Sequence, residues 1–172
     1  MILISYDGSA DAQAAIDNVA RLMPGARTTV LTVWVPFMDS LARPDTTAMG
    51  MGMGMGVYAY AESEGIDAAN RAAALSTAAE GARRATAARL VARPRAQVCD
   101  GDVATTIADV AAEIAADAIV VGTRGLSGIK SFVLGSVSHA VVQNADRAVL
   151  VIPSPALGQR RRRHAGRDAA PA

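Results

Sequence analysis

Residues 118–136 read AIVVGTRGLSGIKSFVLGS, a dense apolar run followed by a stretch that contains four glycines. Short, continuous apolar runs are typical of strands that are buried on both faces of a parallel sheet. Glycines directly after such a strand allow backbone angles and close approaches that a side chain would block. The segment therefore predicts a buried strand that ends in a loop to which another molecule can come close.

On either side of this segment, strand-like and helix-like patterns alternate along the chain. A strand, a helix and the next strand of one sheet are joined by a right-handed crossover, which makes the two strands parallel. We therefore expect an α/β fold with an open, parallel, five-stranded sheet and helices on both faces, and we place the 118–122 strand, the most hydrophobic, at its centre. The predicted strands are 2–6, 28–35, 96–99, 118–122 and 148–152, and the predicted helices are 10–23, about 66–92, 104–115 and 136–145.

Two stretches lack the periodic spacing of apolar residues that is typical of helices and strands. One lies inside the predicted domain, 1–153, and the other follows it. Residues 36–65 include the Met-Gly run at 49–56 and are expected to form a flexible loop. Methionine thioethers are ligands for Cu(I), but alternating glycines cannot hold them in place. Residues 154–172 carry five arginines against one acid and are expected to form a disordered tail. The arginine run at 160–163 has no aromatic neighbours, so nucleic acid is not an expected partner.

The composition indicates a protein of the cytoplasm. Cys99 is the one cysteine, which excludes a disulfide within the chain and fits a reducing compartment. No apolar run approaches the ~18 residues that cross a membrane. Residues 1–7 begin as a strand and lack the pattern of a signal peptide.

The glycine loop, with its open backbone amides, and the helix start at its end together predict an anion site. In parallel sheets, ligands bind beyond the carboxyl ends of the strands. Asp7 follows the first strand, and Gly135-Ser136 opens a helix whose free amides and positive end attract an anion. Hydroxyls of Ser136 and Ser138 add donors, so a phosphate chain is the natural occupant. The spacing matches neither a Walker A loop nor G-x-G-x-x-G, and the alternative that the glycines only form turns stays open.

At these residues the chain resembles a known family. Gly122, Gly125 and the pair Gly135-Ser136 follow the spacing G-x2-G-x9-G-[ST], which is the nucleotide motif of the universal stress proteins. The resemblance covers roughly 1–153 and includes ILISYDGS at the amino end. It implies the adenine nucleotide alpha hydrolase-like fold with strand order 3-2-1-4-5. It also implies a homodimer, which we expect to pair through the edge strand 148–152.

The intact motif places the chain with the ATP-binding branch of that family, so ATP, or alternatively AMP, is the implied ligand. The resemblance implies that Asp7 holds the nucleoside and that the backbone of Val33 contacts adenine. Mg²⁺ or Mn²⁺ bound to the phosphates is a further expected ligand, since a divalent ion bridges clustered negative charges. The motif residues implied to hold ribose and phosphates are Gly122, Gly125, Gly135, Ser136 and the amide of Val137.

Three function classes follow from these observations. The first is an ATP-binding regulatory protein of the stress response. The second is an enzyme of the same fold that hydrolyses or transfers nucleotide, and the third is a dimeric interaction protein that binds no nucleotide. No acid–base pair or activated nucleophile stands out, so no catalytic residue is assigned, although slow ATP hydrolysis stays open. His139 and Cys99 have no other His or Cys at the spacing typical of metal ligands, so no metal-binding side chain is assigned. The sequence does not identify a protein partner.

Overall fold

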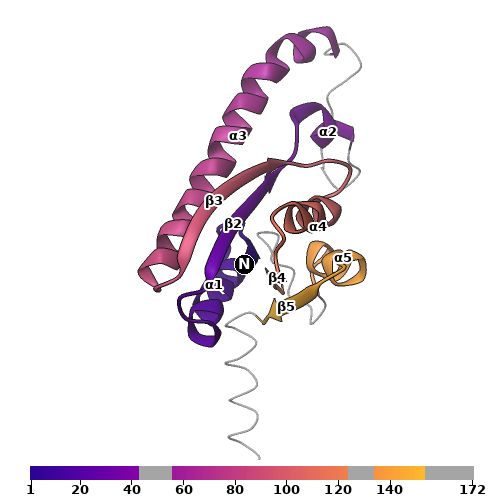
Figure 1. Cartoon of the computed structure of the whole chain (residues 1–172). Helices are drawn as coiled ribbons and strands as arrows, with labels where there is room; N and C mark the ends of the chain where they lie inside the picture. The colour runs from indigo at the N-terminus through magenta and orange to yellow at the C-terminus, as the bar shows by residue number, and fades with distance from the viewer. Residues whose placement is uncertain (43–55, 124–133, 154–172) are drawn as a thin grey trace, which may run out of the picture.

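The structure, a computed structural model, describes residues 1–42, 56–123 and 134–153. A five-stranded parallel sheet with the order β3-β2-β1-β4-β5 forms its centre (Figure 1). The predicted fold class and strand order are therefore confirmed. The central strand is β1 rather than the more hydrophobic strand 118–122, which lies directly beside it. The strands are β1 (Ile2–Ser5), β2 (Arg27–Trp34), β3 (Val91–Val98), β4 (Ala118–Gly122) and β5 (Ala148–Ile152).

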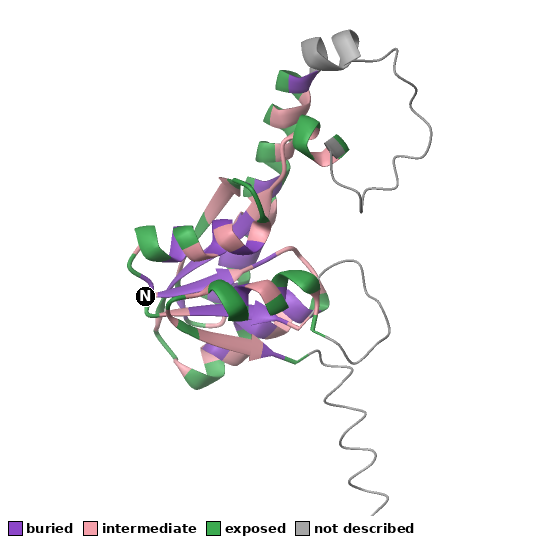
Figure 2. Ribbon diagram, turned by 90° about the vertical axis from the view of Figure 1, so that its right-hand side faces the viewer, coloured by how far each residue is buried: buried purple, intermediate pink, exposed green. Residues whose placement is uncertain are grey.

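Helices cover both faces of the sheet. Residues from α1 and α3 pack with one face, whereas residues from α4 and α5 pack with the other. Figure 2 shows the buried residues concentrated between these layers. The five helices of the described residues are α1 (Ala10–Leu22), α2 (Phe37–Ala42), α3 (Gly56–Ala87), α4 (Val103–Glu113) and α5 (Ser136–Asn144).

Apolar residues at helical spacing form the inner faces of α1 and α4. In α1 the buried apolar residues are Ala12, Ala15, Ile16 and Val19, while Met23 ends the helix and is only partly buried. The first turn of α5 does not bury its apolar residue. Val137 is 37% exposed and Ser138 is buried instead, because the first turn of α5 borders the strand ends rather than the packed core.

The stretch 36–65 is not the continuous loop that we predicted. It contains α2 and also residues 56–65, which form the first ten residues of α3. The rest of the Met-Gly run, 49–55, lies outside the described residues, as does the predicted tail 154–172. A 32-residue α3 therefore runs along the sheet and continues past its end (Figure 1).

The boundary between α3 and β3 also differs from the prediction. The helix ends at Ala87 instead of near 92, the chain turns at Arg89 with a φ of 68°, and β3 begins at Val91 instead of 96. Pro94 lies inside β3 and has no N–H to donate. An edge strand tolerates proline because one side of its backbone has no partner strand. β3 pairs only with β2 in the described sheet, so it can include Pro94, although a proline in a sequence normally argues against a strand.

Candidate functional site

The carboxyl ends of three strands border a cavity of about 190 Å³. Its walls come from the ends of β1, β2 and β4 and from the first turns of α1, α4 and α5. Gly125 lies outside the described residues. The structure brings the other six predicted site residues together around this cavity, namely Asp7, Val33, Gly122, Gly135, Ser136 and Val137.

The first turns of three helices line the cavity, and the first amides of these helices are capped differently. Ser9 caps α1, because its Oγ accepts from the Ala12 amide at 3.2 Å. The Asp102 carboxylate caps α4 by accepting from two backbone amides. Gly135 stands at the cap position of α5 and has no side chain to offer. Among these three helices, α5 therefore has no side-chain cap, and the positive end of its dipole faces the cavity.

Two hydrogen bonds fix the first turn of α5 to the end of β4. The Gly135 amide donates to the Thr123 carbonyl at 2.8 Å, and the Ser138 hydroxyl donates to the Gly122 carbonyl at 2.6 Å. The Gly135 amide is thus already used within the protein. The amides of Ser136 and Val137, which follow it in the first turn and line the cavity, are the ones in position for an anion.

Gly122 has a packing role that the motif did not reveal. A Cβ at this position would lie 2.9 Å from the Asp11 Cβ and 3.0 Å from the Asp11 carbonyl carbon. The absence of a side chain therefore lets α1 approach β4. Sequence reasoning considered Gly122 only for ribose and phosphate binding or for a turn, because Asp11 is more than a hundred residues away in the sequence.

A tight turn holds Asp7 at the cavity wall. Its Oδ1 accepts from the Ser9 amide at 3.0 Å, and Gly8 between them has a φ of 82°. That left-handed conformation favours glycine. The preceding residue is also fixed, since the Thr32 hydroxyl donates to the Tyr6 carbonyl at 2.8 Å. The carboxylate of Asp7 is therefore oriented before any ligand arrives.

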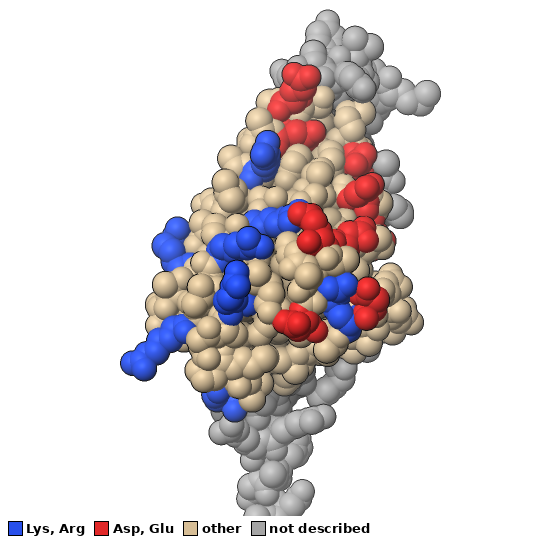
Figure 3. Space-filling model, in the orientation of Figure 1, with Lys and Arg blue, Asp and Glu red and all other residues tan. Residues whose placement is uncertain are grey.

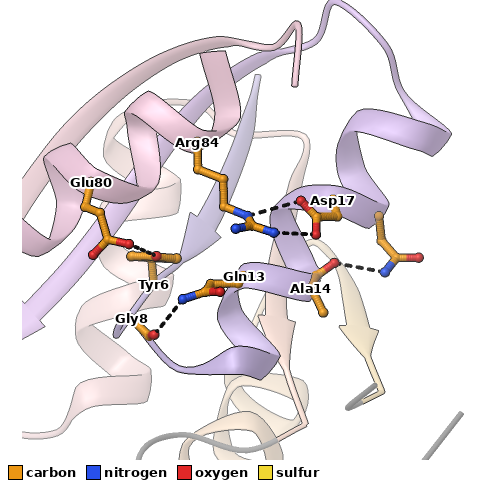
Figure 4. A network of polar contacts seen from close by, with 8 residues as sticks. Tyr6, Gly8, Gln13, Ala14, Asp17, Glu80 and Arg84 are labelled. Atoms are coloured by element: carbon orange, nitrogen blue, oxygen red, sulfur yellow. Dashed lines mark hydrogen bonds and ion pairs between the residues drawn. The ribbon is translucent and has the colours of Figure 1, made fainter. Parts of the chain in front are cut away.

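Tyr6 also lines the cavity and was missed in the sequence analysis. Its side chain is 1% exposed, and its hydroxyl donates to Glu80 Oε1 of α3 at 3.1 Å (Figure 4). Burial, followed by the hydrogen bond and the charge of Glu80, raises the pKa of Tyr6 to about 12. An aromatic residue at the end of a buried strand was the available signal. Its partners on α3 could not be inferred from the sequence.

The described residues contain no group of three or more His, Cys, Asp or Glu side chains that is placed to hold a metal ion. His139 is exposed on α5, and Cys99 is buried at the end of β3. Among the described residues that line the cavity, Asp7 and Tyr6 are the ionisable ones. The described part of the site thus offers backbone amides and hydroxyls rather than a metal-binding cluster.

Comparison with known proteins agrees with this geometry. A sequence model of the universal stress protein family matches residues 1–153. The chain belongs to the universal stress protein family. A universal stress protein of Thermus aquaticus, described as encoded in the QAH/OAS sulfhydrylase 3′ region, is 32% identical over 153 residues, which cover 88% of this chain and 96% of that protein.

Solved structures of universal stress proteins share the fold. One from Burkholderia pseudomallei is 25% identical, with a TM-score of 0.60 and coverage of 88% of this chain and 94% of that one. One from Archaeoglobus fulgidus, in complex with dAMP, is 21% identical, with a TM-score of 0.56 and coverage of 88% and 95%. One from Arabidopsis thaliana, with AMP bound, is 15% identical, with a TM-score of 0.54 and coverage of 90% and 92%.

Proposed function

We propose that this universal stress protein binds an adenine nucleotide, ATP or AMP, in the cavity at the ends of β1, β2 and β4, and that it acts as a nucleotide-dependent regulatory protein of the cytoplasm. The observation that carries the proposal is the α5 N-terminus, which has no side-chain cap and opens into the cavity that Asp7 lines. Solved universal stress proteins that hold dAMP or AMP support the choice of ligand.

The residues that line the cavity favour one orientation of the nucleotide. Phosphates would lie at Ser136 and Val137, where backbone amides and the helix dipole stabilise negative charge. The nucleoside would lie toward Asp7 and Val33, whose strands end side by side. A carboxylate suits the hydroxyls of a ribose, because it accepts hydrogen bonds from them. The same carboxylate would repel a phosphate, so the two ends of the ligand are distinguished.

ATP and AMP differ in how many phosphates the site must neutralise. Gly125 and the cations Arg124 and Lys130 belong to the motif segment that lies outside the described residues. Mg²⁺ or Mn²⁺ bridging the phosphates would reduce the repulsion between them. We therefore expect ATP to gain affinity from the divalent ion and AMP to gain little.

Enzymatic turnover is the second candidate function. General acid–base catalysis needs a titratable pair within hydrogen-bond reach of the reacting atoms. Tyr6 has a raised pKa and directs its hydroxyl to Glu80 on α3, and Asp7 is the other ionisable residue that lines the cavity. The described wall thus favours a binding protein, with slow ATP hydrolysis as the most that the proposal includes.

Calorimetric titration with ATP, AMP and adenosine, with and without Mg²⁺, tests the proposal. The protein is first freed of any nucleotide that copurifies with it. Ser136→Ala should weaken ATP binding by about 1.5–3 kcal/mol, because it removes a hydrogen bond to a charged group. Asp7→Ala should weaken ATP and adenosine alike, since it contacts no phosphate.

Two further variants complete this test. His139→Ala is the matched control, because this exposed α5 side chain does not line the cavity and its loss should leave ATP affinity unchanged. Gly135→Val should abolish ATP binding in a folded protein. A parent protein that binds no adenine nucleotide would refute the proposal, and rapid turnover of the bound ATP would favour the enzyme instead.

A further inference from the structure

Thr123 lies at the point where the chain leaves β4, and three different elements hold it. Its amide donates to the Ile152 carbonyl of β5 at 2.9 Å, and its carbonyl accepts from the Gly135 amide at 2.8 Å. Its hydroxyl donates to Asp11 Oδ2 of α1 at 2.9 Å. Thr123 and Gly135 are therefore joined directly by a hydrogen bond, although eleven residues separate them in the chain.

Asp11 is a buried carboxylate whose position is not explained by helix capping. It lies in the first turn of α1 and is only 8% exposed. Ser9, not Asp11, caps that helix through the Ala12 amide. Burying a carboxylate costs free energy unless hydrogen bonds compensate for the lost water. The α1 dipole offsets part of this cost, and the Thr123 hydroxyl supplies a hydrogen bond from another element.

The Asp11 side chain also packs directly against β4. Gly122 packs against Asp11 so closely that a Cβ would lie 2.9 Å from the Asp11 Cβ. A side chain pressed against a strand has little freedom to move, so its oxygen defines the position of the Thr123 hydroxyl. Because the Thr123 carbonyl accepts from the Gly135 amide, fixing Thr123 also fixes Gly135 and the first turn of α5.

From these contacts we infer that Asp11 is a positioning residue for the phosphate-binding end of the site. It contacts no ligand; it sets Thr123, which in turn sets Gly135 and the amides of α5 that follow. The inference rests on the proposed nucleotide binding and adds to it a specific residue outside the motif. It predicts that loss of the contact weakens phosphate binding while leaving the nucleoside end intact.

The test compares ATP with adenosine in variants of both partners. Thr123→Val keeps the shape of the side chain and removes the hydroxyl, whereas Thr123→Ser keeps the hydroxyl. For each protein we compare the ratio of the ATP and adenosine affinities, together with the thermal unfolding midpoint. Thr123→Val should lower this ratio roughly 3- to 10-fold, the effect of one lost hydrogen bond on the positions it controls. Thr123→Ser should keep the ratio of the parent.

Asp11 variants and a control distinguish positioning from general support of the fold. Asp11→Ala should lower the ratio as much as Thr123→Val does, whereas Asp11→Asn should keep most of the ratio of the parent. The double variant Asp11→Ala/Thr123→Val should have a ratio no lower than that of either single variant, because both changes remove the same contact. Thr105→Val is the matched control. It removes another threonine–carboxylate hydrogen bond, to Asp102 at the start of α4, and neither residue is among the described residues that line the cavity, so the ratio should be unchanged.

The outcomes separate this inference from the proposal beneath it. If the parent binds no adenine nucleotide, the proposed function fails. If the parent binds both, and Thr123→Val lowers the unfolding midpoint with the ratio unchanged, the contact only supports the fold and the inference is overturned. A ratio of ATP to adenosine affinity in Asp11→Asn that is higher than in the parent would also overturn the inference, because the Asp11 charge would then be repelling the phosphates rather than positioning the amides that bind them.

Discussion

Gly122 shows how one residue can meet a requirement of packing and a requirement of binding at the same position. Gly122→Ala would place a Cβ 2.9 Å from the Asp11 Cβ, closer than folded proteins allow. We expect a loss of about 1–3 kcal/mol of stability, since α1 or β4 must shift to make room. Urea unfolding measures this loss. Unchanged stability together with lost ATP binding would mean that Gly122 serves only the ligand.

Tyr6 predicts a pH dependence of stability at high pH. The pKa of this phenol is raised to about 12 in the folded protein and returns to about 10 on unfolding. Below about pH 10 both states are protonated and the stabilising effect is fully present. Between about pH 10 and 12 the unfolded state loses its proton first, so stability falls as the pH rises.

Tyr6→Phe removes both the hydroxyl and its titration. The variant should lose about 0.5–1.5 kcal/mol near neutral pH, because the hydrogen bond to Glu80 is gone. Its urea midpoint should then fall less steeply than that of the parent between pH 10 and 12. Parallel pH profiles for the two proteins would contradict the assignment of this titration to Tyr6.

At the scale of elements, two of the three glycines in α3, Gly65 and Gly81, have different surroundings. A Cβ at Gly81 would lie 2.8–2.9 Å from the buried ring of Tyr6, whereas a Cβ at Gly65 would meet nothing within 4 Å. In a helix interior, alanine is favoured over glycine by about 1 kcal/mol. Gly81 therefore costs α3 intrinsic stability in exchange for close packing of the helix on the sheet.

The two alanine variants of α3 should have opposite effects. Gly65→Ala should stabilise the protein by about 0.5–1 kcal/mol, because only helix propensity changes there. Gly81→Ala should destabilise it, since overpacking costs about 1–3 kcal/mol and exceeds the gain in propensity. Thermal and urea unfolding of the matched pair measure both effects. A stabilised Gly81→Ala protein would show that Tyr6 has room to move.

The two edges of the sheet differ in how they discourage another strand from pairing. β3 carries Pro94 between Arg93 and Arg95, and Figure 3 shows basic side chains over the region of this strand. Proline and charge are both common protections for an edge. β5 reads AVLVI and has neither. An apolar edge without such protection is a liability unless another strand covers it.

At the scale of the whole molecule, we propose that two copies pair along β5, residues 148–152, to form a homodimer. The Ile152 carbonyl accepts from the Thr123 amide, so it points toward β4. Successive residues of a strand direct their backbone groups to opposite sides, and the N–H and C=O of Val151 therefore point to the free edge. Val151→Pro should remove an N–H needed for pairing between copies while leaving the bonds to β4 in place.

Sedimentation at micromolar concentration tests this assembly. The parent should sediment as a dimer and Val151→Pro as a folded monomer. Val151→Ala is the control, because it removes more of the side chain but keeps the N–H, so the dimer should persist. A monomeric parent would refute the proposal.

Local patterns were sufficient to predict the general fold of this protein. The alternation of apolar strands with amphipathic helices predicted the α/β sheet, and β4 and β5 begin and end at the predicted residues. The inner faces of α1 and α4 followed from the spacing of their apolar residues. The spacing of Gly122, Gly125, Gly135 and Ser136 pointed to the edge of the sheet at which the cavity lies. These features depend on neighbours within a few residues, which the sequence displays directly.

Contacts between distant residues decided the rest. Pro94 lies in a strand because β3 is at an edge, and edge position is a property of the completed sheet. The pairs Gly122–Asp11 and Gly81–Tyr6 join elements that are far apart in the chain. The Asp11–Thr123 hydrogen bond spans 112 residues. No periodicity encodes such pairs, because the free energy of close packing and of buried hydrogen bonds depends on which surfaces meet, and only the tertiary structure brings those surfaces together.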